Sequence, residues 1–249
     1  MKVVIIAAGS SSRLADQTKG KPKGLLIVNG KSVIERQILL FKKFGITDIT
    51  IITGPQREKF NYQNICYIHD EDYSDHDVLG SIMAARSIMT DDIIFSYSDI
   101  LFDDSIFEKI LNFQGDMGIG VDLGWEKSYN NRNQHPKEQA DNVIIQNNKI
   151  LKIKKNIPSC KKTQKLGEFI GLTKLSKKGC DIFIKKYLKL KSTHVGKFQD
   201  APSFKKAYLT DMLQELISEG IQISPIIVDG LWCEIDTTQD LQRVKTLFK

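Results

Sequence analysis

The chain has 249 residues, of which 41% are hydrophobic and 27% charged, and it carries a net charge of +6. This length suits one large α/β domain, and the composition excludes a disordered, fibrous or collagen-like chain. The basic runs at 152–155 and 186–191 have no aromatic residues interleaved at regular spacing. We interpret both runs as solvated faces and expect no nucleic-acid partner.

The four cysteines are scattered, with no CxxC pair and no histidine at zinc-finger spacing. This pattern argues against a disulfide framework and against a zinc site. The first apolar run is too short to span a membrane and lacks a signal-peptide pattern. We therefore expect one cytoplasmic domain over residues 1–249 with no membrane partner, and we leave a homodimer open.

Apolar runs typical of strands alternate with amphipathic segments in the first hundred residues. The stretches "KVVIIAA", "DITIITG" and "DDIIFSYSD" predict strands, and "SVIERQILLFKKFG" and "VLGSIMAARSIM" predict the helices between them. Ser32 and Glu35 match a capping box at the start of the first helix, and Gly45 supplies its stop. The alternation predicts βαβ units around a mostly parallel sheet, with the active groups at the carboxyl ends of the strands.

The pattern changes between about residues 125 and 167, where the chain becomes more polar. Two short strands, "DNVIIQ" and "KILKIKK", flank a turn at Asn147 and Asn148, which predicts an antiparallel flap inserted over the main sheet. Helical periodicity then returns at 177–189 and 204–219. The strands "IQISPIIV" and "LWCEID" and a final helix over 237–248 complete the chain.

The first predicted strand ends in a loop of small polar residues, "AAGSSSRL". Small residues let backbone N–H groups approach phosphate oxygens closely, and Arg13 adds a cation, so the loop predicts an anion site. A dinucleotide fingerprint is excluded because Gly9 stands alone. A Walker loop is excluded because Gly24 lies one residue too far from Gly30.

Four motifs together resemble the nucleotidyltransferases that make NDP-sugars and CDP-alcohols. They are the first loop, Pro22-Lys23 before an apolar strand, "YSDILF" with Asp99, and "WCEIDT" with Asp236. The resemblance implies a single-domain, Rossmann-like, three-layer α/β/α fold. The segments "HPKEQADNVII", "GEFIGLTKLSKKG" and "FKKAYLTDMLQELISEG" resemble the branch of phosphonate cytidylyltransferases associated with phosphoenolpyruvate mutase and the phosphocholine cytidylyltransferases.

The chain departs from that branch at two points. It reads "NNRNQHP" where the family often has Gly-Arg-Thr before His-Pro, and it has Asp141 where the family often has Glu. Both departures concern the acceptor pocket.

The resemblance implies a Mg²⁺-dependent cytidylyltransferase that transfers CMP from CTP to a small phosphonate or phosphorylated head group and releases pyrophosphate. Because the reaction joins two polyanions, the site must supply cations. Asp99 and Asp236 are the expected Mg²⁺ ligands, Arg13 would hold the β- and γ-phosphates, and Lys23 would stabilise the α-phosphorus. The expected nucleotide-binding set is Ala7, Ala8, Gly9, Ser10, Ser11, Ser12, Arg13, Lys23, Gly80 and Ser81. The expected acceptor-binding set is Tyr129, Arg132, His135, Glu168, Tyr208, Asp211 and Trp232.

Alternatives stay open at this point. Tyr208 and Trp232 also fit core aromatic positions, and Arg132 and His135 also fit a structural turn. The acceptor could be 2-aminoethylphosphonate, a hydroxyalkylphosphonate, phosphocholine or a phosphorylated amino acid or amide. A sugar-1-phosphate nucleotidyltransferase and a non-catalytic nucleotide sensor are the competing functions.

Overall fold

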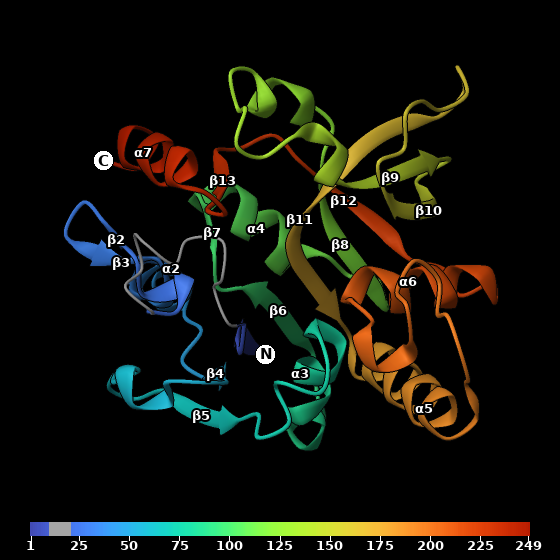
Figure 1. Cartoon of the computed structure of the whole chain (residues 1–249), viewed down its shortest axis with the longest axis horizontal. Helices are drawn as coiled ribbons and strands as arrows, with labels where there is room; N and C mark the ends of the chain where they lie inside the picture. Colours follow the sequence, from blue (N-terminus) through green and yellow to red (C-terminus); the bar gives the residue numbers. More distant parts are fainter. Residues whose placement is uncertain (10–20) are drawn as a thin grey trace.

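The computed structural model describes residues 1–9 and 21–249. Within them a nine-stranded sheet runs in the order β10-β9-β11-β6-β1-β4-β5, with β8 beside β11 and β12 beside β8 (Figure 1). The strands are β1 (Lys2–Ala7), β4 (Ile49–Thr53), β5 (Cys66–His69), β6 (Ile93–Tyr97), β8 (Met117–Asp122), β9 (Asp141–Gln146), β10 (Lys149–Lys155), β11 (Lys165–Leu175) and β12 (Ser224–Val228).

The N-terminal half of the sheet is parallel, as the alternation of runs predicted. β1 lies between β4 and β6, with Ile5 opposite Ile51 on one side and Ser96 on the other. Its residues from Val3 onward are buried, because helices cover both faces of the sheet. This burial explains why the strand is a continuous apolar run instead of an alternating one.

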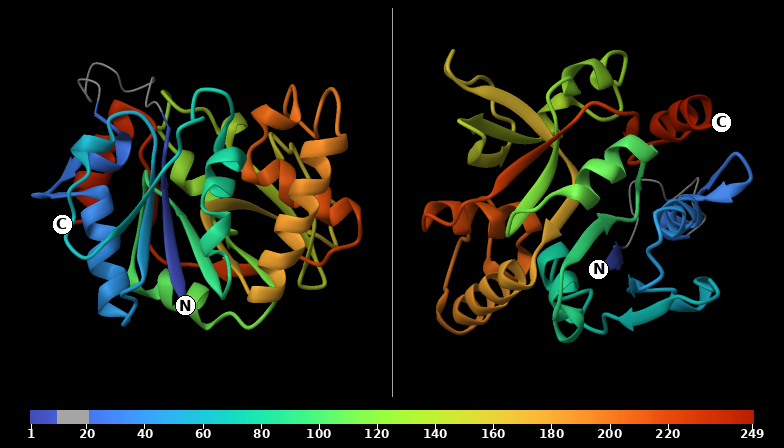
Figure 2. Two further views of the ribbon diagram at one scale, coloured as in Figure 1. Left: turned by 90° about the horizontal axis from the view of Figure 1, so that it is seen from below. Right: turned by 180° about the vertical axis from the view of Figure 1, so that it is seen from behind.

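The helices lie on both faces of the sheet and give the predicted three layers (Figure 2). α2 and α4 pack on one face through one apolar cluster, and α3, α5 and α6 pack on the other through a second. The α-helices of the described residues are α2 (Val33–Lys43), α3 (Val78–Ala84), α4 (Asp104–Asn112), α5 (Lys177–Thr193), α6 (Leu209–Ser218) and α7 (Thr238–Leu247). None of these is long and apolar enough to cross a membrane.

The two predicted flap strands differ from the expectation in their position. They pair across the turn at Asn147 and Asn148, but β9 also pairs with β11, so both strands extend the central sheet instead of covering it. The reason is their apolar face, because Val143 and Ile153 join the cluster that packs against α6. The short 3₁₀ helices η5 (Trp125–Tyr129) and η6 (Lys137–Gln139) belong to the segment that leaves the sheet and contacts α7.

Two small sheets lie at the carboxyl end of the parallel strands. β2 (Ile27–Val28) pairs with β3 (Lys31–Ser32), and β7 (Ile100–Phe102) pairs antiparallel with β13 (Trp232–Glu234). The Ile235 N–H donates to the Asp99 carbonyl at 2.8 Å. A third apolar cluster joins these small sheets to α7 through residues such as Leu26, Leu101 and Leu241. This region therefore brings three distant parts of the chain to one place.

Candidate active site

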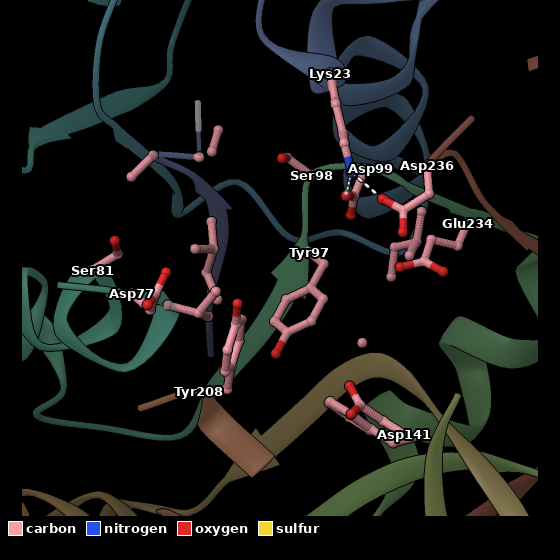
Figure 3. A pocket seen from close by; sticks show the side chains of 18 of the residues that line it. Lys23, Asp77, Ser81, Tyr97, Ser98, Asp99, Asp141, Tyr208, Glu234 and Asp236 are labelled. Atoms are coloured by element: carbon pink, nitrogen blue, oxygen red, sulfur yellow. Dashed lines mark hydrogen bonds and ion pairs between the residues drawn. The ribbon is translucent and has the colours of Figure 1, made fainter. Parts of the chain in front are cut away.

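A cavity of about 600 Å³ opens at the carboxyl ends of β1 and β6 (Figure 3). It has three parts, which we name by what lines them. The β1 side is lined by Ala7, Ala8, Gly9, Asp77 and Ser81; the carboxylate centre by Lys23, Asp99, Glu234, Asp236 and His135; and the β9–β11 side by Asp141, Glu168, Phe169 and Tyr208.

Lys23 forms the middle of the carboxylate centre. It starts the 3₁₀ helix η2 (Lys23–Leu25), and Pro22 precedes it as the N-cap residue. Its Nζ donates to Asp99 Oδ2 at 3.0 Å and also to Asp236 Oδ1. Burial alone would lower the pKa of Lys23, but the charges of Asp99 and Asp236 outweigh burial and raise it. The ammonium group is therefore charged and holds the two carboxylates together.

Two further groups adjoin Asp236. His135, Glu234 and Asp236 each offer a ligand atom within 4.8 Å of one another, and His135 Nδ1 lies 3.1 Å from Asp236 Oδ2. Burial and the neighbouring charges of Asp236 and Asp99 raise the pKa of Glu234 well above its ordinary value. This part of the cavity is built to receive positive charge, and its oxygen donors are of the type that hard divalent cations prefer.

The β9–β11 side holds two more carboxyl groups. Tyr129 donates its hydroxyl hydrogen to Glu168 Oε1 at 2.5 Å, while Glu168 Oε2 and Asp141 Oδ1 are buried and find no hydrogen-bond partner in residues 1–9 and 21–249. Burial raises the pKa of Glu168 to about 8 and that of Asp141 to about 6.

The β1 side is shaped by the end of β1 and by the first turn of α3. Ser81 donates its hydroxyl hydrogen to Asp70 Oδ2 at 2.7 Å, so its oxygen remains available as an acceptor toward the cavity. His76 Nε2 lies 3.1 Å from the other Asp70 oxygen. Buried Asp70 therefore fixes both side chains at this end of the cavity.

Comparison with known proteins shows which proteins the chain is similar to. Residues 3–119 match the model of the MobA-like NTP transferase domain. The chain is 28% identical to a CTP:phosphoglutamine cytidylyltransferase of Campylobacter jejuni, over 97% of this chain and 98% of that protein. Residues 3–119 are thus similar to NTP transferase domains of the MobA-like kind, and nearly the whole chain is similar to one cytidylyltransferase.

Two further proteins are similar to the chain, one in sequence and one in fold. A choline-phosphate cytidylyltransferase of Streptococcus pneumoniae is 34% identical to this chain, over 41% of this chain and 46% of that protein. The solved structure of a CTP:phosphocholine cytidylyltransferase from Streptococcus pneumoniae superposes with a TM-score of 0.74 at 21% identity, covering 100% of this chain and 99% of that one. The three-layer fold is thus that of nucleotidyltransferases.

Most of the expected site residues line the cavity. Those that do are Ala7, Ala8, Gly9, Lys23, Ser81, Asp99, His135, Glu168, Tyr208, Trp232 and Asp236. Ser10, Ser11, Ser12 and Arg13 lie outside the described residues, so the predicted phosphate grip of Arg13 stays a prediction.

Tyr129 and Arg132 do not line the cavity, but each contacts a residue that does. Tyr129 reaches the cavity only through its bond to Glu168. Arg132 donates from Nε to Asp240 Oδ1 at 2.6 Å, and its Nη2 lies 3.7 Å from Glu234 Oε2. Arg132 thereby joins the segment after η5 to α7 and to the carboxylate centre, which is a positioning contact.

Gly80 and Asp211 have structural positions away from the cavity. A Cβ on Gly80 would lie 2.2 Å from the His76 ring, so this glycine is needed for close packing behind Ser81. Asp211 accepts from the Tyr208 N–H at 2.8 Å and from the Asp200 N–H at 3.0 Å, and it caps α6. Both of its carboxylate oxygens therefore accept from backbone N–H groups, as is typical of a capping residue at position N3 of a helix.

Sequence reasoning did not include Glu234 or Asp141 among the expected site residues, although it connected the departure at Asp141 with the acceptor pocket. Glu234 lies two residues from Trp232 and two from Asp236, and this period of two is the signal that places alternate residues on one side of a strand. Asp141 opens a strand directly after η6 and Ala140, and only pairing with β11 brings it into the cavity.

Replacing Glu168 with Gln is expected to stabilise the protein at high pH. The folded chain holds a proton on Glu168 up to about pH 8, whereas an ordinary Glu releases it near 4.5, so the stability contribution of this group falls as pH rises through that window. Glu168→Gln removes the titration and keeps an acceptor for Tyr129. Its melting temperature should exceed that of the wild type by several degrees at pH 8.5 and by much less at pH 5.

The matched control is Glu138→Gln, because Glu138 is exposed. Its difference from the wild type should not change with pH. Equal shifts for Glu168→Gln at pH 5 and pH 8.5 would contradict the raised pKa.

Proposed function

We propose that this protein is a Mg²⁺-dependent cytidylyltransferase that transfers CMP from CTP to a small phosphorylated or phosphono acceptor. Support comes from the alignment with a CTP-dependent relative over nearly the whole length of both chains. The observation that carries the proposal is that Lys23, Asp99 and Asp236 line the same cavity as the β1 side and the β9–β11 side. A donor and an acceptor could meet there over these charged groups.

The two ends of the cavity would hold the two substrates. The backbone at Ala7 to Gly9 and the Ser81 hydroxyl would bind the cytidine end of CTP, and the β9–β11 side would bind the acceptor. An acceptor phosphate oxygen then attacks the α-phosphorus, the bond from that phosphorus to the α,β-bridging oxygen breaks, and pyrophosphate leaves. No general base is needed, because the second pKa of a phosphate is about 6 and its oxygen is already ionised at pH 7.

Asp99 and Asp236 would hold the magnesium ion. They fit this role because their oxygens already converge on one cation, the Lys23 ammonium, and because Mg²⁺ prefers carboxylate oxygens. His135 and Glu234 lie beside Asp236 and complete a polar shell. A bound Mg²⁺ would neutralise phosphate charge at the reacting phosphorus.

Lys23 would stabilise the negative charge that develops on the α-phosphoryl group in the transition state. Its ammonium lies at the carboxylate centre. Its backbone begins η2, which precedes β2 in the chain. A fixed cation stabilises a charge that grows in the transition state more than it stabilises the ground state. In this proposal Arg13 binds the β- and γ-phosphates.

The test is a matrix of pyrophosphate release. CTP, UTP, ATP and GTP are each combined with Mg²⁺ and with phosphoglutamine, phosphocholine, 2-aminoethylphosphonate and glucose-1-phosphate. We expect release with CTP and one or more of the first three acceptors, and none after chelation with EDTA. Release only with glucose-1-phosphate would support a sugar nucleotidyltransferase instead, and CTP binding without any release would support a sensor.

A further inference from the structure

The β9–β11 side of the cavity contains two buried carboxyl oxygens that lack a donor. They are Glu168 Oε2 and Asp141 Oδ1, and neither has a hydrogen-bond partner in the part of the chain that the structure describes. Both residues line the cavity, and Glu168 is only 4% exposed. Figure 3 shows Asp141 below the carboxylate centre, with its carboxyl group directed into the cavity. Buried acceptors of this kind are normally satisfied, so these two oxygens point to a ligand with donors.

Nearby positive charge compensates these two carboxyl groups only in part. Burial raises the pKa of both groups; the Tyr129 hydrogen bond and Arg132 lower the pKa of Glu168, and the negative charge of Asp141 raises it. Lys155 lowers the pKa of Asp141, but Lys155 itself is exposed and lies over the Tyr208 ring at 5.2 Å. A cationic ligand group would favour the ionised form of Glu168, which would give up its proton, and both carboxylates would then offer acceptor oxygens.

Aromatic residues near these oxygens could also contact a cation, so both a trimethylammonium group and a primary ammonium group have to be considered. Tyr97, Phe169 and Tyr208 line the same part of the cavity and could receive a cation over their rings. A trimethylammonium group could attract the carboxylates through its charge, but it has no N–H and would leave Glu168 Oε2 and Asp141 Oδ1 without hydrogen-bond donors. A primary ammonium group has three N–H donors and can satisfy both oxygens.

We propose that Asp141 and Glu168 bind the nitrogen of the acceptor and that they select an acceptor with a primary ammonium tail over one with a trimethylammonium tail. The inference rests on the proposed cytidylyltransferase function and names its acceptor class. Tyr129 is a positioning residue in this subsite, because its hydroxyl fixes Glu168 Oε1 and turns the other oxygen to the cavity.

The experiment uses acceptors that differ only in methylation of the nitrogen. Phosphoethanolamine, its N-methyl and N,N-dimethyl derivatives and phosphocholine share one phosphate and one carbon chain. The pair of 2-aminoethylphosphonate and 2-(trimethylammonio)ethylphosphonate repeats the comparison on a phosphonate, and phosphoglutamine is assayed beside them. The kcat/KM for pyrophosphate release with CTP and Mg²⁺ should fall as N–H donors are removed, with at least a tenfold difference between the two ends of each series.

Variants then test whether these two carboxyl groups cause the preference. Asp141→Asn and Glu168→Gln should reduce the difference between primary and trimethylated acceptors at least fivefold by raising the KM of the primary amine. Both variants should keep the KM for CTP within about twofold, since they lie away from the β1 side. Glu138→Gln is the control, because Glu138 is exposed and does not line the cavity.

The outcomes separate the two proposals. Equal or better use of the trimethylated member of each pair overturns the ammonium selection while leaving the cytidylyltransferase intact. The same holds if both variants lower kcat/KM for all acceptors by the same factor. No pyrophosphate release with any acceptor overturns the proposed function itself.

Discussion

Asp236→Asn is expected to lower the rate of pyrophosphate release by roughly a thousandfold, the scale on which a metal ion stabilises charge at a reacting centre. Asp236 is 5% exposed and meets Lys23, and its other oxygen lies 3.1 Å from His135. Losing this charge would remove half of the proposed Mg²⁺ site. The measurement is kcat at saturating CTP over a titration of Mg²⁺.

The control is Asp229→Asn, because Asp229 is exposed and pairs only at the surface with Lys109. It should keep the wild-type rate. A second comparison sharpens the test, since Asp99→Asn combined with Asp236→Asn should be little worse than either change alone if both carboxylates serve one ion. Full activity of Asp236→Asn would refute the metal assignment, and additive losses would argue for two separate roles.

Lys23→Met is expected to reduce kcat by about a hundredfold to a thousandfold, as removal of a fixed donor to a developing charge commonly does. The affinity for CTP should change by less than tenfold, because the role of Lys23 lies in the transition state. Single-turnover rates and equilibrium CTP binding, measured on the same preparation, separate the two effects. A melting curve is needed beside them, since Lys23 also holds Asp99 and Asp236 together.

Lys21→Met is the matched control, because Lys21 lies two residues earlier and is exposed. It should leave kcat unchanged and alter only weak, salt-dependent attraction of the nucleotide. Equal losses of rate and of CTP affinity in Lys23→Met would make Lys23 a binding residue. An unchanged rate would remove it from the mechanism.

The parallel half of the sheet and the centre of the site could be predicted because their signals are local. An apolar run that ends in "AAG", a Pro-Lys pair and an Asp directly after a strand each carry their meaning within a few residues. Parallel strands then bring such ends to one edge of a sheet, so Lys23 and Asp99 follow from local patterns.

The meeting of Asp99 with Asp236 depends on a longer-range contact. It is made by two strands of only three residues each, β7 and β13, whose pairing no periodicity announces. The sequence motifs predicted that Asp99 and Asp236 share a site. The contact that brings them together is the backbone hydrogen bond from the Ile235 N–H to the Asp99 carbonyl.

The β9–β11 side was harder to predict, because the sequence does not distinguish a carboxylate that lines a cavity from one that accepts hydrogen bonds from the backbone. Asp211 stands in a helix-start position and caps α6. Asp141 and Glu168 become neighbours only through the register of β9 with β11, a strand whose pairing with β8 is interrupted by a bulge beyond Phe169. Such registers are decided by the packing of the whole sheet.

The attachment of α7 links catalysis to the end of the chain. Asp236 lies directly before this helix, whose Leu241 and Val244 pack in the third apolar cluster and not in the two large ones beside the sheet. Asn29 holds its last turn by donating to the carbonyls of Lys245 and Phe248. Elements with small separate cores open before the whole molecule unfolds. We therefore expect warming to abolish activity through local opening of α7, while amides in β1 and β6 remain protected from hydrogen exchange. A bulky C-terminal tag should promote the same opening.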